Sequence, residues 1–318
     1  MLVPIILIGV GFVLLIKGAD WMVSGSSAFA KKNNISNIAI GLTIVAFGTS
    51  APELVVNSFA SFHGYSDIVF GNVIGSNNFN LFIILGIVGL ISPIIVQSNT
   101  VWKEIPLSLF AVLILYLLSN SFFFQESSIL TRFDGLVLLV MFGFFLFYVY
   151  RQLKTEDTVS EIAIIPMSTL KIWSLIILGL LGLILGGKFV VDNAVEVASR
   201  MGVSEKIIGL TIVAAGTSLP ELVTSVVAVL RKNNDIAIGN IIGSNIFNIL
   251  LIISVSSFVK PIEFNSLFNI DIYILAGGTI FLFIAMFTGR KKKLDRWEAA
   301  LLLGSYLAYS VYLVGKEL

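Results

Sequence analysis

The chain has 318 residues, of which 57% are hydrophobic and only 12% are charged. A soluble domain carries about 25% charged residues, and no soluble core could bury this much apolar surface. The net charge of +1 gives no sign of a nucleic-acid partner, and one histidine with no cysteine excludes disulfides and metal sites built from His and Cys. The composition therefore predicts an all-α integral membrane protein.

Ten apolar segments follow one another along the chain, each close to the roughly 20 residues that cross a bilayer as a helix. We expect spans at residues 2–24, 36–61, 67–92, 104–121, 133–150, 170–193, 205–230, 236–258, 270–288 and 297–314. Thirteen Lys and Arg residues lie in the loops on one side of this arrangement, and five lie on the side of the two termini. The positive-inside rule therefore predicts that both termini are extracellular.

The sequence also repeats itself at a constant offset of 168 residues. GLTIVAFGTSAPE at 41–53 matches GLTIVAAGTSLPE at 209–221 in eleven of thirteen positions. GNVIGSNNFN at 71–80 matches GNIIGSNIFN at 239–248 in eight of ten positions. Chance does not produce two such matches at one offset, so the chain consists of two homologous halves.

Each half contains five of the ten expected spans, and an odd number makes the halves cross the membrane in opposite directions. We therefore expect a first five-helix repeat at 1–150, a cytoplasmic linker at 151–169 and an inverted second repeat at 170–318. In transporters built this way the ligand site usually lies near the bilayer midplane, where broken helices of the two repeats meet.

Polar residues within the repeated motifs are spaced so that each set forms one stripe on a helix. The first motif places one stripe on helix 2 and its copy on helix 7, and the second motif does the same for helices 3 and 8. The four stripes are Ala46, Thr49, Ser50 and Glu53; Ala214, Thr217, Ser218 and Glu221; Asn72, Ser76 and Asn80; and Asn240, Ser244 and Asn248. We expect these four stripes to pack together.

The first motif of each repeat also contains a proline, directly before the glutamate. Pro52 has no N–H, and its ring clashes with the carbonyl of Gly48; Pro220 does the same to Gly216. We therefore predict kinks in helices 2 and 7, with carbonyl groups freed at membrane depth. Such groups are tolerated where they line a cavity or bind a ligand.

The two glutamates of the stripes need a counter-charge. An ionised carboxylate at a helix centre costs about 2.5–3.5 kcal/mol, and no Lys or Arg lies in the four stripes. Unless another span supplies a basic side chain, cations or protons must therefore neutralise Glu53 and Glu221. The surrounding hydroxyl, amide and carbonyl oxygens suit hard cations such as Ca²⁺ and Na⁺ better than Mg²⁺ or softer metals.

Other polar and small residues have simpler explanations. Lys17 and Asp20, and likewise Lys188 and Asp192, lie near predicted span ends, and we interpret them as structural residues that snorkel to the interface or pair there. The glycines of the second motif are spaced as in helices that pack closely together.

These motifs, at matching places in both halves, resemble those of the cation/Ca²⁺ exchanger superfamily, in particular its prokaryotic Na⁺/Ca²⁺ exchanger-like branch. The resemblance implies an antiporter of a prokaryotic plasma membrane in which helices 1 and 6 slide against the other helices. Ca²⁺ and Na⁺ would bind as substrates, with the lipid bilayer as surroundings and with no cofactor, enzymatic activity or obligatory protein partner.

The resemblance also implies a role for each stripe residue. Glu53 and Glu221 would bridge the Ca²⁺ and Na⁺ sites, and the remaining ligands would be backbone carbonyls, hydroxyls and central amides. These are the carbonyls of Ala46, Thr49, Ala214 and Thr217, the hydroxyls of Ser50, Ser76, Ser218 and Ser244, and the side chains of Asn80 and Asn248.

Asparagine at both 80 and 248 departs from relatives that carry acidic residues there, so the predicted pocket holds at most two carboxylates. One Ca²⁺ or two Na⁺ ions balance that charge, and K⁺ dependence becomes less expected. Proton-coupled Ca²⁺ exchange stays open, because buried carboxyl groups can also bind protons. A cation channel or sensor is a more distant alternative, and an intramembrane enzyme is the least expected, since no His or Cys accompanies the glutamates in the stripes.

Overall fold

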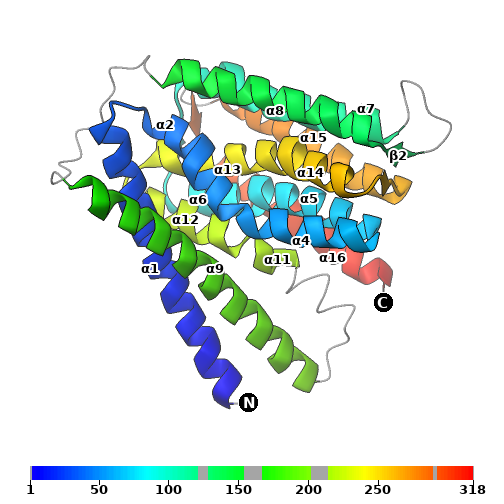
Figure 1. Cartoon of the computed structure of the whole chain (residues 1–318), viewed down its shortest axis with the longest axis horizontal. Helices are drawn as coiled ribbons and strands as arrows, with labels where there is room; N and C mark the ends of the chain where they lie inside the picture. The colour runs from blue at the N-terminus through cyan, green and yellow to red at the C-terminus, as the bar shows by residue number, and fades with distance from the viewer. Residues whose placement is uncertain (1, 121–127, 154–166, 202–213, 289–291, 318) are drawn as a thin grey trace. The chain divides into compact units, whose positions relative to one another are not determined.

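A computed structural model of the chain describes residues 2–120, 128–153, 167–201, 214–288 and 292–317 (Figure 1). The chain divides into two compact units. Unit 1 comprises residues 1–55 and 143–244, and unit 2 comprises residues 56–142 and 245–318. Each unit combines residues from both halves of the sequence, so the unit boundaries do not coincide with the predicted repeat boundaries. Those boundaries stay a prediction, and most of the predicted linker lies outside the described residues.

Unit 1 is helical through almost all of its described residues. Its elements are α1 (Leu2–Lys32), α2 (Asn37–Ile40), the π-helical turn η1 (Gly41–Val45), α3 (Ala46–Thr49), the start of α4 (Ala51–His63), the end of α8 (Arg132–Gln152), α9 (Thr169–Arg200), α11 (Ala214–Thr217), α12 (Leu219–Leu230) and most of α13 (Asn234–Ile246). The two long helices α1 and α9 lie side by side along much of their length (Figure 1).

Glycines bring the backbones of α1 and α9 into direct contact. A Cβ atom added at Gly18 would lie 2.7 Å from the Leu183 nitrogen and 2.8 Å from the Gly179 oxygen. A Cβ atom at Gly11 would lie 2.9 Å from the oxygen of Gly186. Later residues of α1 meet earlier residues of α9, so the helices are antiparallel. Small residues permit this close approach, which gains van der Waals contact between the backbones.

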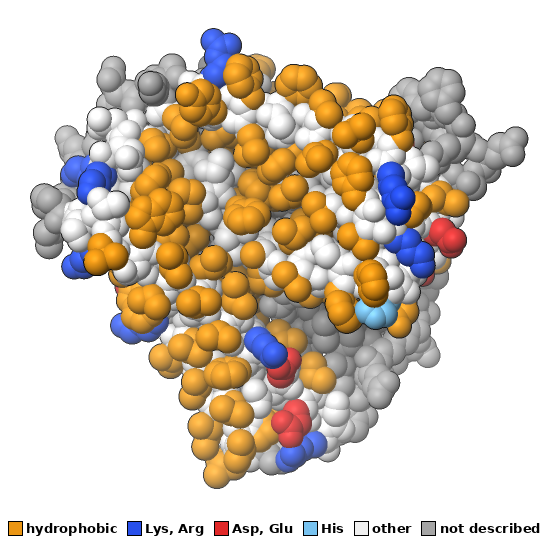
Figure 2. All heavy atoms as spheres, viewed as in Figure 1, with side chains coloured by type: hydrophobic (Ala, Val, Ile, Leu, Met, Phe, Trp, Pro, Cys, Tyr) orange, Lys and Arg blue, Asp and Glu red, His pale blue; other side chains and the backbone are white. Residues whose placement is uncertain are grey.

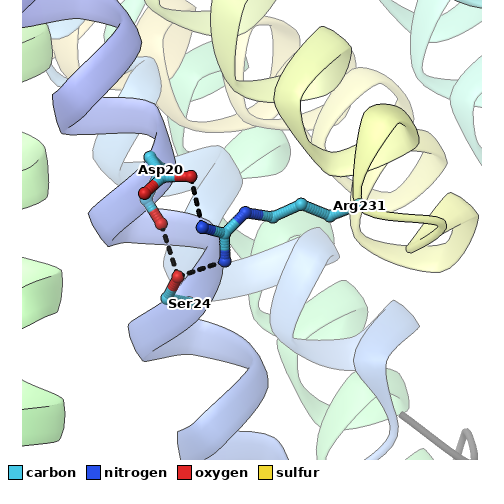
Figure 3. A network of polar contacts seen from close by, with 3 residues as sticks. All are labelled: Asp20, Ser24 and Arg231. Carbon is cyan, nitrogen blue, oxygen red and sulfur yellow. Dashed lines mark hydrogen bonds and ion pairs between the residues drawn. The ribbon is translucent and has the colours of Figure 1, made fainter.

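A polar contact ties α1 to the end of α12 (Figure 3). The guanidinium group of Arg231 pairs with the carboxylate of Asp20 and donates a hydrogen bond to the hydroxyl of Ser24. Of the two structural readings, snorkelling and pairing, Asp20 is found in an ion pair, but among the described residues its partner is Arg231 and not Lys17. The planar guanidinium can satisfy two oxygens on adjacent turns of α1. Lys188 and Asp192, for which the same two readings were open, form no ion pair among the described residues.

Unit 2 contains the remaining helices and two very short antiparallel strand pairs. Its elements are the rest of α4, α5 (Ser66–Asn78), the π-helical turn η2 (Phe79–Ile84), α6 (Leu85–Ile91), β1 (Ile94–Ile95), the π-helical turn η3 (Thr100–Glu104), α7 (Ile105–Ser119), β2 (Ile129–Leu130), most of α8, the end of α13, the π-helical turn η5 (Phe247–Ile252), α14 (Ile253–Val259), β3 (Ile262–Glu263), the 3₁₀ turn η6 (Ser266–Phe268), α15 (Asn269–Ala285), β4 (Lys293–Leu294) and α16 (Arg296–Glu317). Strand β1 pairs with β4, and β2 pairs with β3.

Seven helices in the described part of the chain are long and apolar enough to cross a membrane. The segments Asn37–Thr49 and Ala51–His63 make an eighth if they are counted as one span with a bend of 48°. The expected span at 205–230 begins outside the described residues, and α16, at the tenth expected place, is not among the seven. The count of ten therefore stays a prediction. Figure 2 shows apolar side chains over much of the visible surface, as helices that face lipid require.

Candidate cation site

Both candidate glutamates lie in the first turn of a helix that begins directly after a residue without helical backbone angles. Helix α3 ends at Thr49, Ser50 has φ −84° and ψ 4°, and α4 begins directly afterwards with Glu53 in its first turn. In the second repeat Ser218, with φ −91° and ψ 7°, precedes α12, which carries Glu221 in its first turn. A negative charge is favoured at this end of a helix, because unpaired N–H groups and the helix dipole make it positive.

The two glutamates both belong to unit 1. Each is only 1% exposed. The buried hydroxyl of Ser50 donates a hydrogen bond of 3.1 Å to Oε1 of Glu221, which joins the break before α4 to the carboxylate of the other repeat. Oε2 of Glu221 has no hydrogen-bond partner among the described residues.

Asn240 of α13 forms hydrogen bonds with residues of α3 and α12 next to the glutamates. Its amide donates to the Ser225 hydroxyl at 3.0 Å and to the backbone oxygen of Glu221 at 3.4 Å. Its amide oxygen accepts a hydrogen bond of 3.0 Å from the hydroxyl of Thr49. These contacts hold α3, α12 and α13 together around the glutamates. The helices can approach because glycines stand at the crossing: a Cβ at Gly243 would lie 2.8 Å from the Cβ of Ala46.

A second polar cluster lies in unit 2 and consists of four asparagines, which we call the asparagine cluster: Asn77, Asn80, Asn245 and Asn248. All four side chains are buried. The amides of Asn77 and Asn245 donate to each other's backbone oxygens at 3.2 and 3.3 Å. Asn80 donates to Oδ1 of Asn245 at 3.1 Å, and Asn248 donates to Oδ1 of Asn77 at 3.0 Å.

The predicted ligands are therefore distributed over both units. Unit 1 contains Thr49, Ser50, Glu53 and Glu221, and the Ala46 carbonyl already accepts a hydrogen bond of 3.0 Å from the Ser50 N–H. Further members of the prediction are also placed, namely Thr217, Ser218 and Ser244 in unit 1 and Ser76, Asn80 and Asn248 in unit 2. For Ala214 the structure describes only the backbone, at the start of α11.

Several buried oxygens in these clusters have no hydrogen-bond partner among the described residues. They are Oε2 of Glu221, the hydroxyls of Ser76, Ser218 and Ser244, and Oδ1 of Asn80 and Asn248. Leaving such a group unpaired costs about 1–3 kcal/mol, so a buried set of them requires an explanation. Carboxylate, hydroxyl and amide oxygens of these kinds are the ligands that hard cations prefer.

Sequence reasoning did not identify Asn77 and Asn245 as functional. A signal was present, since each lies three residues before a candidate ligand in both copies of the second motif. Ser225 was also missed, and its counterpart at the repeat offset is Asn57, so no repeated pattern marks it.

Comparisons with known proteins agree with this chemistry. The family model described as "Sodium/calcium exchanger protein" matches residues 3–151 and 171–315. "Putative antiporter CaxA" of Alkalimonas amylolytica is 38% identical, with 98% of this chain and 99% of that protein covered. "Sodium/calcium exchanger MaX1" of Methanosarcina acetivorans is 30% identical, with coverage of 95% and 96%.

A solved structure of the sodium-calcium exchanger NCX_Mj, soaked with zero Na⁺ and Ca²⁺, has the same fold, with a TM-score of 0.84 at 32% identity. The match covers 98% of this chain and 99% of that one. Family, relatives and fold agree over nearly the whole length, and all describe transporters rather than enzymes. The chain therefore belongs to the sodium/calcium exchanger protein family and is an integral membrane antiporter of Ca²⁺ and other cations.

Proposed function

We propose that this protein exchanges Na⁺ for Ca²⁺ across the membrane by alternating access, with the two buried glutamates as the charged ligands. The observation that carries the proposal is the burial of Glu53 and Glu221 in one unit, where Ser50, three residues before Glu53, donates a hydrogen bond to Glu221. The two glutamates occupy equivalent positions in the two repeats. Two carboxylates balance one Ca²⁺ or two Na⁺ ions but not a full load of both. Binding of one ion species therefore displaces the other, which is the requirement for exchange.

The names of two relatives support Na⁺ as the coupling ion. MaX1 and NCX_Mj are both named as exchangers of sodium and calcium. The proposed ligands are those the sequence predicts: Glu53 and Glu221 with the carbonyls, hydroxyls and amides of the four stripes. Ca²⁺ and Na⁺ are the transported substrates, and no cofactor takes part.

The finer architecture belongs to the same proposal. We infer ten membrane spans, arranged as two inverted five-helix repeats with kinked helices 2 and 7. The bend of 48° at Ser50 and the matching break at Ser218 support the kinks. The excess of Lys and Arg in loops on one side supports extracellular termini and a cytoplasmic linker at 151–169.

Measurement of ⁴⁵Ca²⁺ uptake into proteoliposomes tests the coupling ion. Gradients of Na⁺, K⁺ and H⁺ are imposed one at a time, with the other two clamped. We expect an outward-directed Na⁺ gradient alone to drive uptake. Uptake driven only by a proton gradient would instead support proton-coupled exchange, and flux without any counter-ion would indicate a channel.

The same assay tests the site. Glu53→Gln and Glu221→Gln remove one charge each at nearly constant volume, and we expect each to abolish Na⁺-driven uptake. Glu196→Gln is the matched control, because that glutamate lies on α9 with its side chain 44% exposed and pairs with Arg200. Transport at the level of the unmodified protein by both site variants would refute the assignment.

A further inference from the structure

Two amide oxygens of the asparagine cluster have no hydrogen-bond partner among the described residues, although their amide nitrogens do. They are Oδ1 of Asn80 and Oδ1 of Asn248, and both side chains are 1% exposed. A primary amide can turn by 180° and exchange its oxygen for its nitrogen with little change in shape. Other contacts must therefore keep the amides of Asn80 and Asn248 in the orientation in which the oxygen, and not the NH₂ group, lacks a partner.

The orientation can be derived from the backbone. A backbone carbonyl can only accept hydrogen bonds, so the group that the Asn77 side chain directs at the carbonyl of Asn245 must be its NH₂. The same argument fixes the NH₂ of Asn245 against the carbonyl of Asn77. Each of these two side chains then turns its oxygen away from the contact.

The side-chain oxygens of Asn77 and Asn245 in turn fix the orientation of the two central amides, those of Asn248 and Asn80. Oδ1 of Asn77 lies 3.0 Å from Nδ2 of Asn248, and Oδ1 of Asn245 lies 3.1 Å from Nδ2 of Asn80. Turning Asn80 or Asn248 over would place two acceptor oxygens at that distance with no proton between them. Both central asparagines are therefore held with NH₂ toward the cluster and oxygen away from it.

We propose that Asn77 and Asn245 are positioning residues that orient the amides of Asn248 and Asn80 so that their oxygens bind the transported cation. Each positioning residue acts on the central asparagine of the other repeat. The proposal rests on the cation site proposed above, and it adds two residues that contact other side chains rather than the ion.

The chemistry of the ion makes orientation decisive. An amide oxygen carries the partial negative charge that Ca²⁺ and Na⁺ bind, whereas the NH₂ group carries partial positive charge and repels them. Without the positioning residue, the amide turns between both orientations or donates to another acceptor. We expect loss of one such hydrogen bond to weaken Ca²⁺ binding about tenfold.

Equilibrium Ca²⁺ binding to the purified full-length protein tests the proposal through double-mutant cycles. We expect Asn77→Ala and Asn245→Ala to raise the Kd about tenfold. The effect of Asn77→Ala should largely disappear when Asn248→Ala is already present, because no amide is left to orient. Asn245→Ala should behave in the same way toward Asn80→Ala. For Asn77→Ala and Asn80→Ala, which lie in the same repeat, the two effects on the free energy of Ca²⁺ binding should be closer to additive.

Asn78→Ala is the matched control. Asn78 is also buried on α5, donates a hydrogen bond of 3.1 Å to the backbone oxygen of Asp271, and has isoleucine at the equivalent position of the second repeat. We expect this variant to bind Ca²⁺ with unchanged affinity. Size-exclusion elution checks folding, and serine replaces alanine at any position where the alanine variant aggregates.

Two outcomes overturn the positioning role: unchanged affinity in Asn77→Ala and Asn245→Ala, or coupling that is as strong within one helix as across the repeats. A merely structural role would lower stability without this crossed pattern. Glu221→Gln in the same titration separates the two proposals. Binding lost in Glu221→Gln but retained in Asn77→Ala contradicts the positioning role alone, and binding retained in Glu221→Gln contradicts the cation site.

Discussion

A single methyl group at Gly18 should separate the two long helices of unit 1. In Gly18→Ala the new Cβ would lie 2.7 Å from the nitrogen of Leu183, 2.8 Å from the oxygen of Gly179 and 2.9 Å from the carbonyl carbon of Gly182. All three are backbone atoms, so no side-chain rotation relieves the contact. Ordinary van der Waals contact begins at 3.4 Å, and α9 must therefore move away from α1 by roughly 0.7 Å.

The expected cost follows from two opposing terms. Overpacking of a tightly packed contact costs about 1–3 kcal/mol. Replacement of glycine by alanine within a helix recovers about 0.5–1 kcal/mol, because the unfolded chain loses conformational freedom. The net destabilisation lies between about 0 and 2.5 kcal/mol, and its middle value of about 1 kcal/mol corresponds to a melting temperature lower by about 2–4 °C.

Thermal unfolding of purified protein in one detergent, followed by size-exclusion chromatography after heating, measures this shift. Gly9→Ala is the control on the same helix, since a Cβ there would meet no described atom within 4 Å. That variant should be as stable as the unmodified protein or slightly more stable. The reasoning fails if Gly18→Ala melts at the same temperature as Gly9→Ala.

Three further substitutions test other contacts by the same unfolding assay. Thr49→Val keeps the backbone carbonyl but leaves a buried amide oxygen of α13 unpaired, which should cost about 1–3 kcal/mol; unchanged stability would show that another donor replaces the hydroxyl. Arg231→Gln should cost less than about 1 kcal/mol, because the side chains of Arg231 and Asp20 are 41% and 38% exposed, and a larger loss would contradict that weak pairing. Glu298→Ala removes the acceptor, at 2.7 Å, of the Asp295 N–H at the start of α16 and should cost about 0.5–2 kcal/mol, whereas glutamine at that position should retain more of the stability.

Composition and the lengths of the apolar segments were enough to predict an all-helical membrane protein and the positions of most helices. Apolar runs bounded by charge mark where α1, α8 and α9 lie, because lipid imposes the same requirement on every span. The residues at which helices end were less predictable. Helix α9 continues to Arg200, beyond the expected end at 193, because a helix that leaves the apolar layer can continue in water and form the exposed Arg200–Glu196 pair.

The candidate site shows a similar limit. Glu53 and Glu221 could be identified from sequence because a buried charge is costly wherever it lies in a span. The partners of a side chain depend on which helices meet, and no local pattern encodes that. Asp20 is an example: its nearest basic residue in sequence is Lys17, but the end of α12 supplies Arg231 instead.

The hydrogen bonds of the two clusters differ in one respect that bears on transport. In the asparagine cluster every bond has a counterpart when the two repeats are exchanged, so the bonds of Asn77 and Asn245 are equivalent. The glutamate cluster is unsymmetrical, since Ser50 donates to Glu221 while the hydroxyl of Ser218 has no partner among the described residues. If inward- and outward-facing states arise by exchanging the roles of inverted repeats, a symmetrical network can persist through the change, whereas the Ser50–Glu221 bond must break and its counterpart must form. We therefore expect the asparagines to present their oxygens in both states and the serine bonds to differ between them.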